Sequence, residues 1–335
     1  MIASHTLASE HSWSWFRRDH DHECYFADSG TDKELTDVVS GGVLSRYAHV
    51  RSTEILRDIR ELSDDPEAYA AELSRRWGGL LSYRYIGRFH ASMDNGEPDE
   101  TVTMRRDMRN PSGGLLLAVL GIASPDSGGV SDLEAVPNPV IWSGQILDPG
   151  HDVTRFEVKT EVLKQGRQMA YSRSQIVDAD NPLRVLALTE GQGVSIGVPP
   201  EGLQKMEHAP LEIVDSPDLP PLWQAFGGAC RPVGHWVLPQ LSVEVASPDA
   251  ALHIGPQFVI LETAAFDVAC GAAGTDRLQA TSGHVMFLAR GKVGPFRVEA
   301  QPIVGADGTV AARAVLHDEG NGDKAITAAS YVFSC

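Results

Sequence analysis

A carboxylate inside an apolar stretch is the feature of this sequence that first suggests chemistry. Glu262 lies in the middle of the apolar run from Phe258 to Val268, which follows a Gly-Pro pair at Gly255 and Pro256. Proline suits a first helical turn, because the N–H that it lacks would be unpaired there. The run therefore predicts a helix that is buried on nearly all sides. A charge inside it is costly unless it is paired or its raised pKa is used, so Glu262 is either a hydrogen-bonded structural residue or a candidate acid or base.

Two glycine-containing segments lead into apolar helices and could present backbone N–H groups near such a carboxylate. One is His253-Ile254-Gly255, and the other is Asn110-Pro111-Ser112-Gly113-Gly114. The first N–H groups of a helix have no partner within it, so they can polarise a carbonyl oxygen. For Gly113-Gly114, a tight turn from strand to helix is an equally good interpretation.

The composition is that of a globular protein with an acidic surface. The chain has 335 residues and a net charge of −17. This charge argues against nucleic acid or an anionic membrane as the general partner, and it leaves room for an anionic small ligand at a local basic patch. The longest apolar run, residues 114–123, is too short to cross a bilayer, and the N-terminus lacks a secretory signal pattern. The four cysteines form no CxxC pair and predict free thiols in a reducing compartment, so we expect a cytoplasmic protein.

The chain divides into four parts. Residues 1–79 combine a polar tail with a helical pattern, residues 80–196 and 230–335 each place strands around one apolar helix, and the Pro-rich residues 197–229 link them. In the tail, residues 19–23 (Asp-His-Asp-His-Glu) carry metal-ligand side chains. No framework in the pattern fixes them, so we favour a flexible acidic terminus and predict no metal site. The predicted strands cover residues 81–93, 101–108, 140–146, 154–163, 168–177, 183–189, 234–238, 241–245, 279–288, 296–304, 310–317 and 325–333, and the two apolar helices cover residues 115–123 and 256–268.

The two strand-rich parts repeat each other along the chain. Asp178 matches Asp318, and Phe156-Glu157-Val158 matches Phe296-Arg297-Val298 at an identical offset. Gly114 matches Gly255 at nearly the same offset. The common period of about 140 residues is too long for a solenoid, and it indicates a duplicated domain.

Each half thus has a strand hairpin, a glycine-rich break, an apolar helix and an antiparallel run of four strands. This order resembles the hot-dog fold, and it is most similar to acyl-CoA thioesterases of the phenylacetate-degradation type. Those proteins carry an Asn, a His-Gly-Gly at the helix start and an acid further along the helix. In the second half, His253-x-Gly255 and Glu262 match that motif. The resemblance implies an α+β fold, a tandem or double hot-dog with two antiparallel sheets, each wrapped around a central helix, and an N-terminal helical extension.

In the first half the motif is incomplete. Asn110 and Ser112-Gly113-Gly114 match the break with Ser in place of His, and the position of the acid falls on Gly121. Hot-dog domains pair with their helices side by side, so the resemblance implies two unequal sites. One would combine Gly113 and Gly114 as oxyanion donors with Glu262 as general base or nucleophile, and Asn110 would hold the water or the carbonyl. The mirror site would combine His253 and Gly255 with Gly121, which carries no chemistry.

The substrate that the resemblance implies is an acyl-CoA, with coenzyme A entering only as part of the substrate and no separate cofactor. Three basic residues near the expected mouth, Arg105, Arg106 and Arg109, are candidates to bind its phosphates, with Arg290 and Lys292 as weaker ones. A solvated strand edge is the alternative interpretation of the same residues. A homodimer of double hot-dogs is an open expectation for assembly.

Two other functions compete with thioester hydrolysis. Loss of the acid at Gly121 and of the His at Ser112 favours a non-catalytic protein that binds acyl-CoA or acyl groups. Residues 178–183 (Asp-Ala-Asp-Asn-Pro-Leu) resemble a motif of hot-dog enoyl-CoA hydratases. There Arg184 stands in place of the His, and the segment is predicted to be a hairpin turn, so the hydratase is the weakest of the three.

Overall fold

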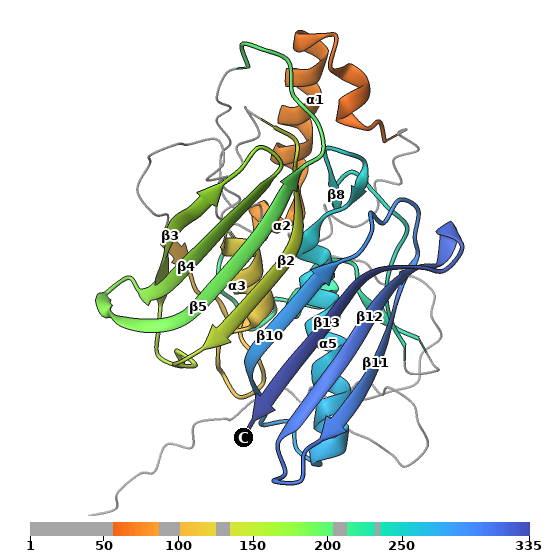
Figure 1. Ribbon diagram of the computed structural model, residues 1–335. Coiled ribbons are helices and arrows are strands. Elements are labelled where there is room, and N and C mark those ends of the chain that lie inside the picture. Colours follow the sequence, from red (N-terminus) through yellow and green to blue (C-terminus); the bar gives the residue numbers. More distant parts are fainter. Residues whose placement is uncertain (1–55, 87–100, 125–134, 204–212, 232–234) are drawn as a thin grey trace, which may run out of the picture.

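The computed structural model describes residues 56–86, 101–124, 135–203, 213–231 and 235–335 (Figure 1). The histidine-containing tail at residues 19–23, the first part of the predicted N-terminal helical pattern and the predicted turn at residues 94–98 lie outside these ranges. Within the described ranges, no helix is long and apolar enough to cross a membrane.

The N-terminal extension is helical, as predicted, and packs at one end of the molecule (Figure 1). A short 3-10 helix, Ile59–Leu62, precedes α1, Pro66–Gly79, where the Asp65 side chain caps the helix by accepting the N–H of Ala68 at 3.0 Å. The predicted strand from Leu81 is wrong, because residues Leu81–Ile86 form the helix α2. Its buried residues include Leu81 and Tyr85, four positions apart, so one helical stripe faces the core.

The predicted strand at residues 241–245 is wrong, because these residues form a turn before β8 (Ala246–Ser247), and the predicted strand at 101–108 is a strand only at Thr101–Thr103 and then becomes a 3-10 turn. The other elements follow the predicted order. In the first half they are β1 (Thr101–Thr103), a 3-10 turn (Arg106–Met108), α3 (Leu117–Ala123), β2 (Pro137–Ile146), β3 (Arg155–Gln165), β4 (Met169–Asp178) and β5 (Asn181–Ser195). In the second half they are α4 (Leu222–Ala225), β6 (Ala229–Cys230), β7 (Trp236–Leu238), β8 (Ala246–Ser247), β9 (Ala251–Leu252), α5 (Ile254–Ala273), β10 (Gln279–Phe287), β11 (Phe296–Val304), β12 (Val310–Asp318) and β13 (Lys324–Ser334). The segment that resembles the hydratase motif joins β4 to β5 as a hairpin turn, as predicted.

The strands form one continuous sheet of 11 strands in the order β1-β3-β4-β5-β2-β10-β13-β12-β11-β7-β6, beside a small β8-β9 ladder. The prediction of two separate sheets is therefore wrong. The reason is the antiparallel pairing of β2 with β10, in which Gly144 lies opposite Gly283. Close packing explains why both are glycine: a β-carbon would lie 2.4 Å from the Trp142 ring at Gly144 and 3.1 Å from the Tyr331 ring at Gly283.

The two halves of this sheet share one topology. Counting outward from the Gly144–Gly283 pair, the first half runs β2, β5, β4, β3, β1 and the second runs β10, β13, β12, β11, β7. The register repeats as well, because Phe156 pairs with Asp178 as Phe296 pairs with Asp318. These are the same residues that match each other in the sequence repeat.

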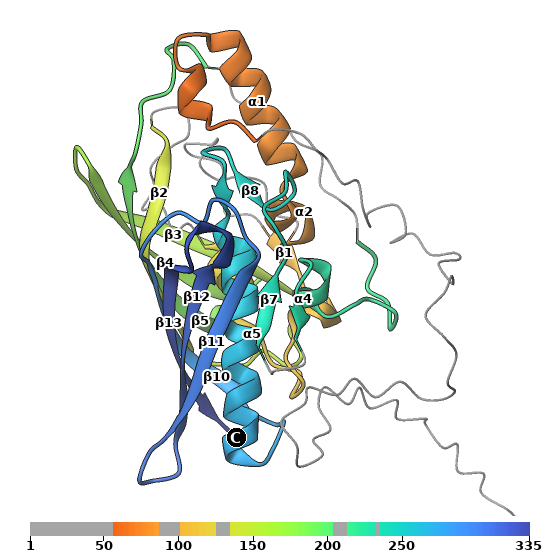
Figure 2. The ribbon, with the colours of Figure 1, turned by 90° about the vertical axis from the view of Figure 1, so that its right-hand side faces the viewer.

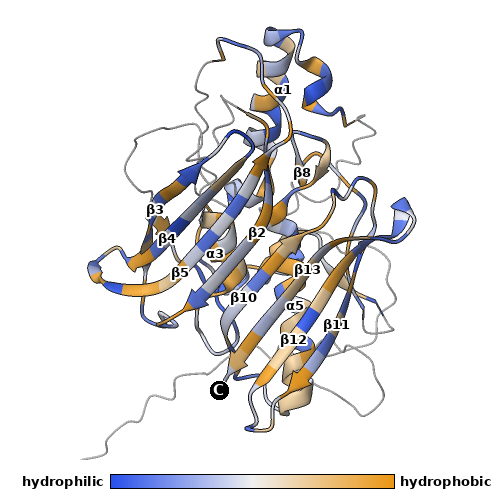
Figure 3. Ribbon diagram, viewed as in Figure 1, coloured by the Kyte–Doolittle hydropathy of each residue, from blue (hydrophilic) through white to orange (hydrophobic). Residues whose placement is uncertain are grey.

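The long helix α5 lies along one face of the sheet, beside the shorter α2 and α4 (Figure 2), and α3 packs against α5. The main hydrophobic core fills the space between this helical layer and the sheet. Figure 3 shows mixed hydrophobic and hydrophilic residues along β3, β4 and β5, as expected for strands with one buried and one exposed face. The helix α5 is deeply buried, and the buried group includes Glu262.

The cysteines differ from the prediction at one position. Cys270 and Cys335 are free, the first buried and the second exposed, whereas Cys230 is disulfide-bonded. The prediction of free thiols throughout is therefore wrong at Cys230, and the cysteines no longer support a reducing compartment.

Candidate active site

The carboxylate of Glu262 joins the two central helices. It projects from α5 to the start of α3, where it accepts the N–H of Leu117 at 3.1 Å and the N–H of Ala118 at 2.6 Å. The residue is 3% exposed. These are two of the N–H groups that a helix start leaves without an internal partner, so the acid of one half meets the helix start of the other.

The environment of Glu262 brings its pKa close to neutrality. Burial favours the uncharged acid, and the hydrogen bonds from Ala118 and Leu117 favour the carboxylate. Burial dominates and raises the pKa of Glu262 to about 7. A carboxyl group with this pKa can accept a proton from water near neutral pH and release it again.

Asn110 organises the loop that precedes α3. Its Oδ1 accepts the Gly114 N–H at 2.9 Å, and its Nδ2 donates to Oε1 of Gln279 at 2.7 Å. Gln279 in turn donates to the carbonyl of Leu115 at 3.0 Å. The sequence analysis missed Gln279, because a glutamine at the first position of a strand forms no recognisable pattern. Its role becomes visible only when β10 lies against the loop.

The N–H groups of the two predicted oxyanion donors are both directed to Asn110. Gly113 donates to the Asn110 carbonyl and Gly114 to its side chain, each at 2.9 Å. Gly114 must be glycine, since a β-carbon there would lie 1.9 Å from Oε1 of Gln279. Gly113 has φ of +89°, a conformation that glycine adopts without strain.

A small pocket lies beside Glu262 and Asn110. Its walls come from both helices and from α4: Asn110, Pro111, Leu116, Ala118, Leu222, Trp223, Val259, Glu262, Thr263 and Phe266. Its free space of about 30 Å³ exceeds the minimum for one water molecule. A water there would lie among Glu262, Asn110 and Thr263, with mainly apolar residues around them.

The mirror position is closed by an aromatic ring. In the sequence repeat, Gly121 corresponds to Glu262 and Leu117 to Phe258, both at the offset that relates Gly114 to Gly255. The Glu262–Leu117 contact therefore has a counterpart between Gly121 and Phe258. There, a β-carbon on Gly121 would lie 2.9 Å from the Phe258 ring. The Phe258 ring therefore occupies the space beside Gly121 that would correspond to the space occupied by the Glu262 carboxyl group.

The Phe258 ring is itself held in place by a second aromatic contact. It packs edge-on against Trp142, with 5.0 Å between the ring centroids. Both rings are almost fully buried. The mirror position is therefore a tightly packed part of the core.

His253 and Gly255 lie at the start of α5, away from Glu262. Nine residues of helix separate His253 from Glu262, about 14 Å along the axis. His253 is the N-cap, and its Nδ1 accepts the Gly255 N–H at 3.2 Å and lies 2.9 Å from Oγ of Ser82. Burial lowers the pKa of His253 to about 3, so the ring is neutral. The structure thus brings Asn110 and Glu262 together at one pocket. Gly113 and Gly114 contact Asn110 but are not among the residues that line this pocket, and His253 and Gly255 lie elsewhere.

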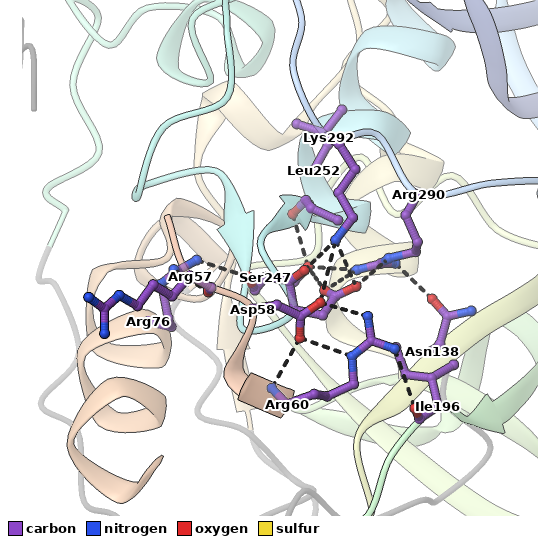
Figure 4. Close-up of polar contacts among 12 residues, drawn as sticks. Arg57, Asp58, Arg60, Arg76, Asn138, Ile196, Ser247, Leu252, Arg290 and Lys292 are labelled. Carbon is purple, nitrogen blue, oxygen red and sulfur yellow. Dashed lines mark hydrogen bonds and ion pairs between the residues drawn. The ribbon is translucent and has the colours of Figure 1, made fainter. Parts of the chain in front are cut away.

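The three candidate phosphate-binding arginines have different surroundings. Arg105 is buried and forms two hydrogen bonds of 3.0 Å with Asp107. Arg109 donates to the carbonyls of Gly113, Gly150 and Val153. Arg106 is exposed at the surface, where its side chain donates to Asp215 at 3.1 Å. Arg290 and Lys292, shown in Figure 4, belong to a separate cluster of ion pairs, where both lie near the Asp249 carboxylate.

No family model matches the chain, and no curated protein matches it in sequence. Solved structures with a similar chain path include the tesB protein of Mycobacterium avium subsp. paratuberculosis, which is 10% identical over 72% of this chain and 96% of its own, with a TM-score of 0.47. A hot-dog fold protein from Alicyclobacillus acidocaldarius is 12% identical over 73% and 98%, with a TM-score of 0.46. An acyl-CoA thioesterase II from Mycobacterium marinum is 12% identical over 72% and 94%, with a TM-score of 0.44.

Proposed function

We propose that this protein is a double hot-dog hydrolase that cleaves acyl-CoA thioesters, with its chemistry at Glu262. One observation carries the proposal: Glu262 is buried between the two halves, beside a pocket with room for water, and its pKa is about 7. A carboxyl group in that state is suited to remove a proton from water at neutral pH. The matching topology of the two halves supports a fused pair of hot-dog domains.

In the proposed reaction, the Glu262 carboxylate takes one proton from a water molecule in the pocket as the water oxygen attacks the thioester carbon. The resulting tetrahedral oxyanion collapses, the C–S bond breaks, and the proton passes from Glu262 to the leaving thiolate. The products are a carboxylic acid and free coenzyme A. The hydrogen bonds from Leu117 and Ala118 hold the carboxylate in position during these transfers.

The oxyanion would be stabilised by donors around Asn110. The Asn110 side chain lines the pocket, and it receives the Gly114 N–H and donates through Nδ2. In the proposed complex, the thioester oxygen takes a hydrogen bond from one of these donors, which gives up its present acceptor, since Gly113 and Gly114 donate to Asn110 and Asn110 donates to Gln279. Arg106 is the proposed contact for the phosphates of coenzyme A, because its side chain reaches solvent.

A second candidate function is binding of an acyl-CoA or acyl group without turnover. It is favoured by the same hydrogen bonds, since both oxygens of Glu262 already have backbone donors and the residue therefore satisfies the start of α3. In that case Glu262 is a buried structural acid. The mirror position, with the Phe258 ring against Gly121, has already lost any acid.

Release of free thiol from a panel of acyl-CoAs separates these functions. A hydrolase releases coenzyme A at a rate that saturates with substrate, with chain lengths from acetyl to palmitoyl and aromatic acyl groups compared. A binding protein retains the acyl-CoA intact, as equilibrium dialysis would show. Loss of enoyl absorbance without thiol release would instead identify a hydratase.

A further inference from the structure

The pocket beside Glu262 is small and is closed on one side by apolar side chains. Its free space is about 30 Å³. One water molecule needs about 10–15 Å³ of such space, so the pocket holds roughly two or three groups of that size. The partly exposed part of its wall includes Pro111, Leu116 and Thr263. The buried apolar part comes from α4 and α5: Leu222, Trp223, Val259 and Phe266. A group that enters past the partly exposed residues therefore ends against the buried ones.

Trp223 is the largest side chain of the buried wall, and a second ring supports it. It packs edge-on against Trp236, with 5.0 Å between the ring centroids. Trp236 does not line the pocket, and its indole N–H donates to Asp267 of α5 at 3.1 Å. The Trp223 ring is thus supported from outside the pocket by a residue that is itself fixed to α5.

The backbone that carries Trp223 is fixed at both ends of α4, which lies beside α5 (Figure 2). At the start of α4, the carbonyl of Pro221 accepts the N–H of Gln224 at 2.9 Å. After its end, the N–H of Gly228 donates to the carbonyl of Trp223 at 2.8 Å. Gly228 must be glycine, because a β-carbon there would lie 2.7 Å from that carbonyl oxygen. Enlarging the pocket at Trp223 therefore requires these contacts to break.

The bulk of Trp223 is particular to this side of the molecule. Residues 81–86 match residues 222–227 at the offset that relates Gly114 to Gly255, with Leu at the first position and an aromatic residue at the fifth. Trp223 then corresponds to Ser82. Ser82 lies so close to the start of α5 that a β-carbon on Gly255 would be 2.1 Å from its Oγ. A small side chain thus stands at the mirror position, whereas a large ring narrows the pocket beside the acid.

We propose that this pocket takes the acyl group of the substrate and that Trp223 limits this group to about two or three carbons. The substrate class is then acetyl and propionyl thioesters of coenzyme A. This inference rests on the proposed function, because it places the acyl group beside Glu262 as the general base. The attacking water takes one share of the free space, and a methyl or ethyl group takes the rest. A longer chain has to displace Trp223 from Trp236.

The direct test compares kcat/KM for acetyl-, propionyl-, hexanoyl- and octanoyl-CoA by release of free thiol from the full-length protein. One methylene group changes the discrimination of a fitted apolar pocket by about 10–200-fold. We therefore expect the better of the two short substrates to exceed hexanoyl-CoA by at least about 10-fold. Equal or faster hydrolysis of hexanoyl-CoA would overturn this inference and leave the proposed hydrolysis intact.

Variants of α4 assign the limit to one side chain. Trp223→Leu should raise the ratio of hexanoyl-CoA to acetyl-CoA turnover by at least about 10-fold. Trp223→Phe removes less of the core, so it serves if the first variant does not fold, and it should shift the ratio in the same direction. Gln224→Ala changes an exposed residue of the same helix and is the matched control, with an unchanged ratio. If folded Trp223 variants keep the wild-type ratio, Trp223 does not set the chain length.

Binding of substrate analogues separates this inference from the proposed hydrolysis. Ketone analogues of acyl-CoA, with a methylene group between the sulfur and the carbonyl carbon, cannot be hydrolysed, and calorimetric titration measures their affinity. If the wild type releases no thiol but binds the acetyl analogue more tightly than the hexanoyl analogue, the acyl pocket stands and the hydrolysis fails. If neither the wild type nor Trp223→Leu binds any analogue or releases thiol, both proposals fail.

Discussion

The ring of Phe258 lies against Gly121 so closely that a β-carbon on Gly121 would be 2.9 Å from two ring carbons. This contact joins α3 to α5 at the position that mirrors the contact between Glu262 and Leu117. The two helix–helix contacts are therefore chemically different versions of one arrangement, one polar and one apolar. In the proposed reaction, this asymmetry leaves Glu262, and not Gly121, to act as the acid or base.

We expect Gly121→Ala to destabilise the fold by about 1–3 kcal/mol, because the added methyl group overpacks a rigid aromatic contact. Phe258→Leu should relieve this clash when both substitutions are present. The double variant should therefore lose less free energy of unfolding than the sum of the losses of the two single variants. Gly79→Ala is the matched control, since the nearest atom to its β-carbon would be 3.9 Å away. Urea denaturation of the wild type and these four variants measures the free energies of unfolding, and strict additivity would contradict the packing account.

Glu262 should make stability depend on pH in a distinctive direction. Its folded pKa of about 7 lies above the ordinary value of 4.5, so the folded protein binds more protons than the unfolded chain between these values. Stability therefore falls as pH rises from about 4.5 to 7. Each pKa unit corresponds to about 1.4 kcal/mol. As pH rises from about 4.5 to 7, the free energy of unfolding of Glu262→Gln should therefore increase by about 3 kcal/mol relative to that of the wild type. Denaturant titrations at several pH values test this, and a constant difference between the two proteins would contradict it.

His253 should act in the opposite direction. Its folded pKa of about 3 lies below the ordinary value of 6.5, so its contribution to stability is fully present above pH 6.5 and is lost as pH falls toward 3. Relative to wild type, His253→Asn should therefore lose less stability on acidification from pH 6.5 to 4.5. Because Glu262 and His253 oppose each other in this range, only comparisons with the variants are informative. If the stabilities of the wild type and of His253→Asn fall in parallel as pH is lowered, His253 is not buried as a neutral ring.

Arg106 should affect substrate affinity without affecting the fold. Its side chain is 42% exposed and pairs only with the exposed Asp215 among the groups described, so Arg106→Ala should change stability little. If it contacts coenzyme A phosphates, KM should rise at low salt and the effect should shrink as salt increases. Asp215→Ala is the control, since it frees Arg106 and should not raise KM. Arg105→Ala and Arg109→Ala should lower the melting temperature, because these side chains hold Asp107 and three backbone carbonyls.

The sequence predicted secondary structure and topology best where a single pattern determined them. The bounds of β11, Phe296–Val304, follow from its pattern and turns, and the internal sequence repeat anticipated the equal topology of the two halves. The strand predicted from Leu81 failed because tertiary packing selected a helix for a short apolar segment. The joining of the halves into one sheet depends on β2 meeting β10, a long-range pairing that no local pattern encodes.

The candidate site was predictable in part for similar reasons. A carboxylate within an apolar helix is a local anomaly, so Glu262 could be found, and the duplication suggested that it meets the opposite helix start. The actual donors, Leu117 and Ala118, lie a few residues beyond the glycines, because α3 begins only at Leu117. Gln279 and the wall of Trp223 come from distant segments and become apparent only in three dimensions.

The most direct test of the account is the kcat of Glu262→Gln on the best acyl-CoA substrate, measured beside Asp267→Asn. Asp267 is an acid on the same helix that accepts the indole N–H of Trp236 at 3.1 Å, so its change to an amide controls for loss of charge on α5. If Glu262 is the general base, Glu262→Gln should lower kcat by about 10²–10⁴-fold with KM nearly unchanged, while Asp267→Asn stays near wild type. A Glu262→Gln protein that is folded and retains wild-type kcat would contradict the central claim.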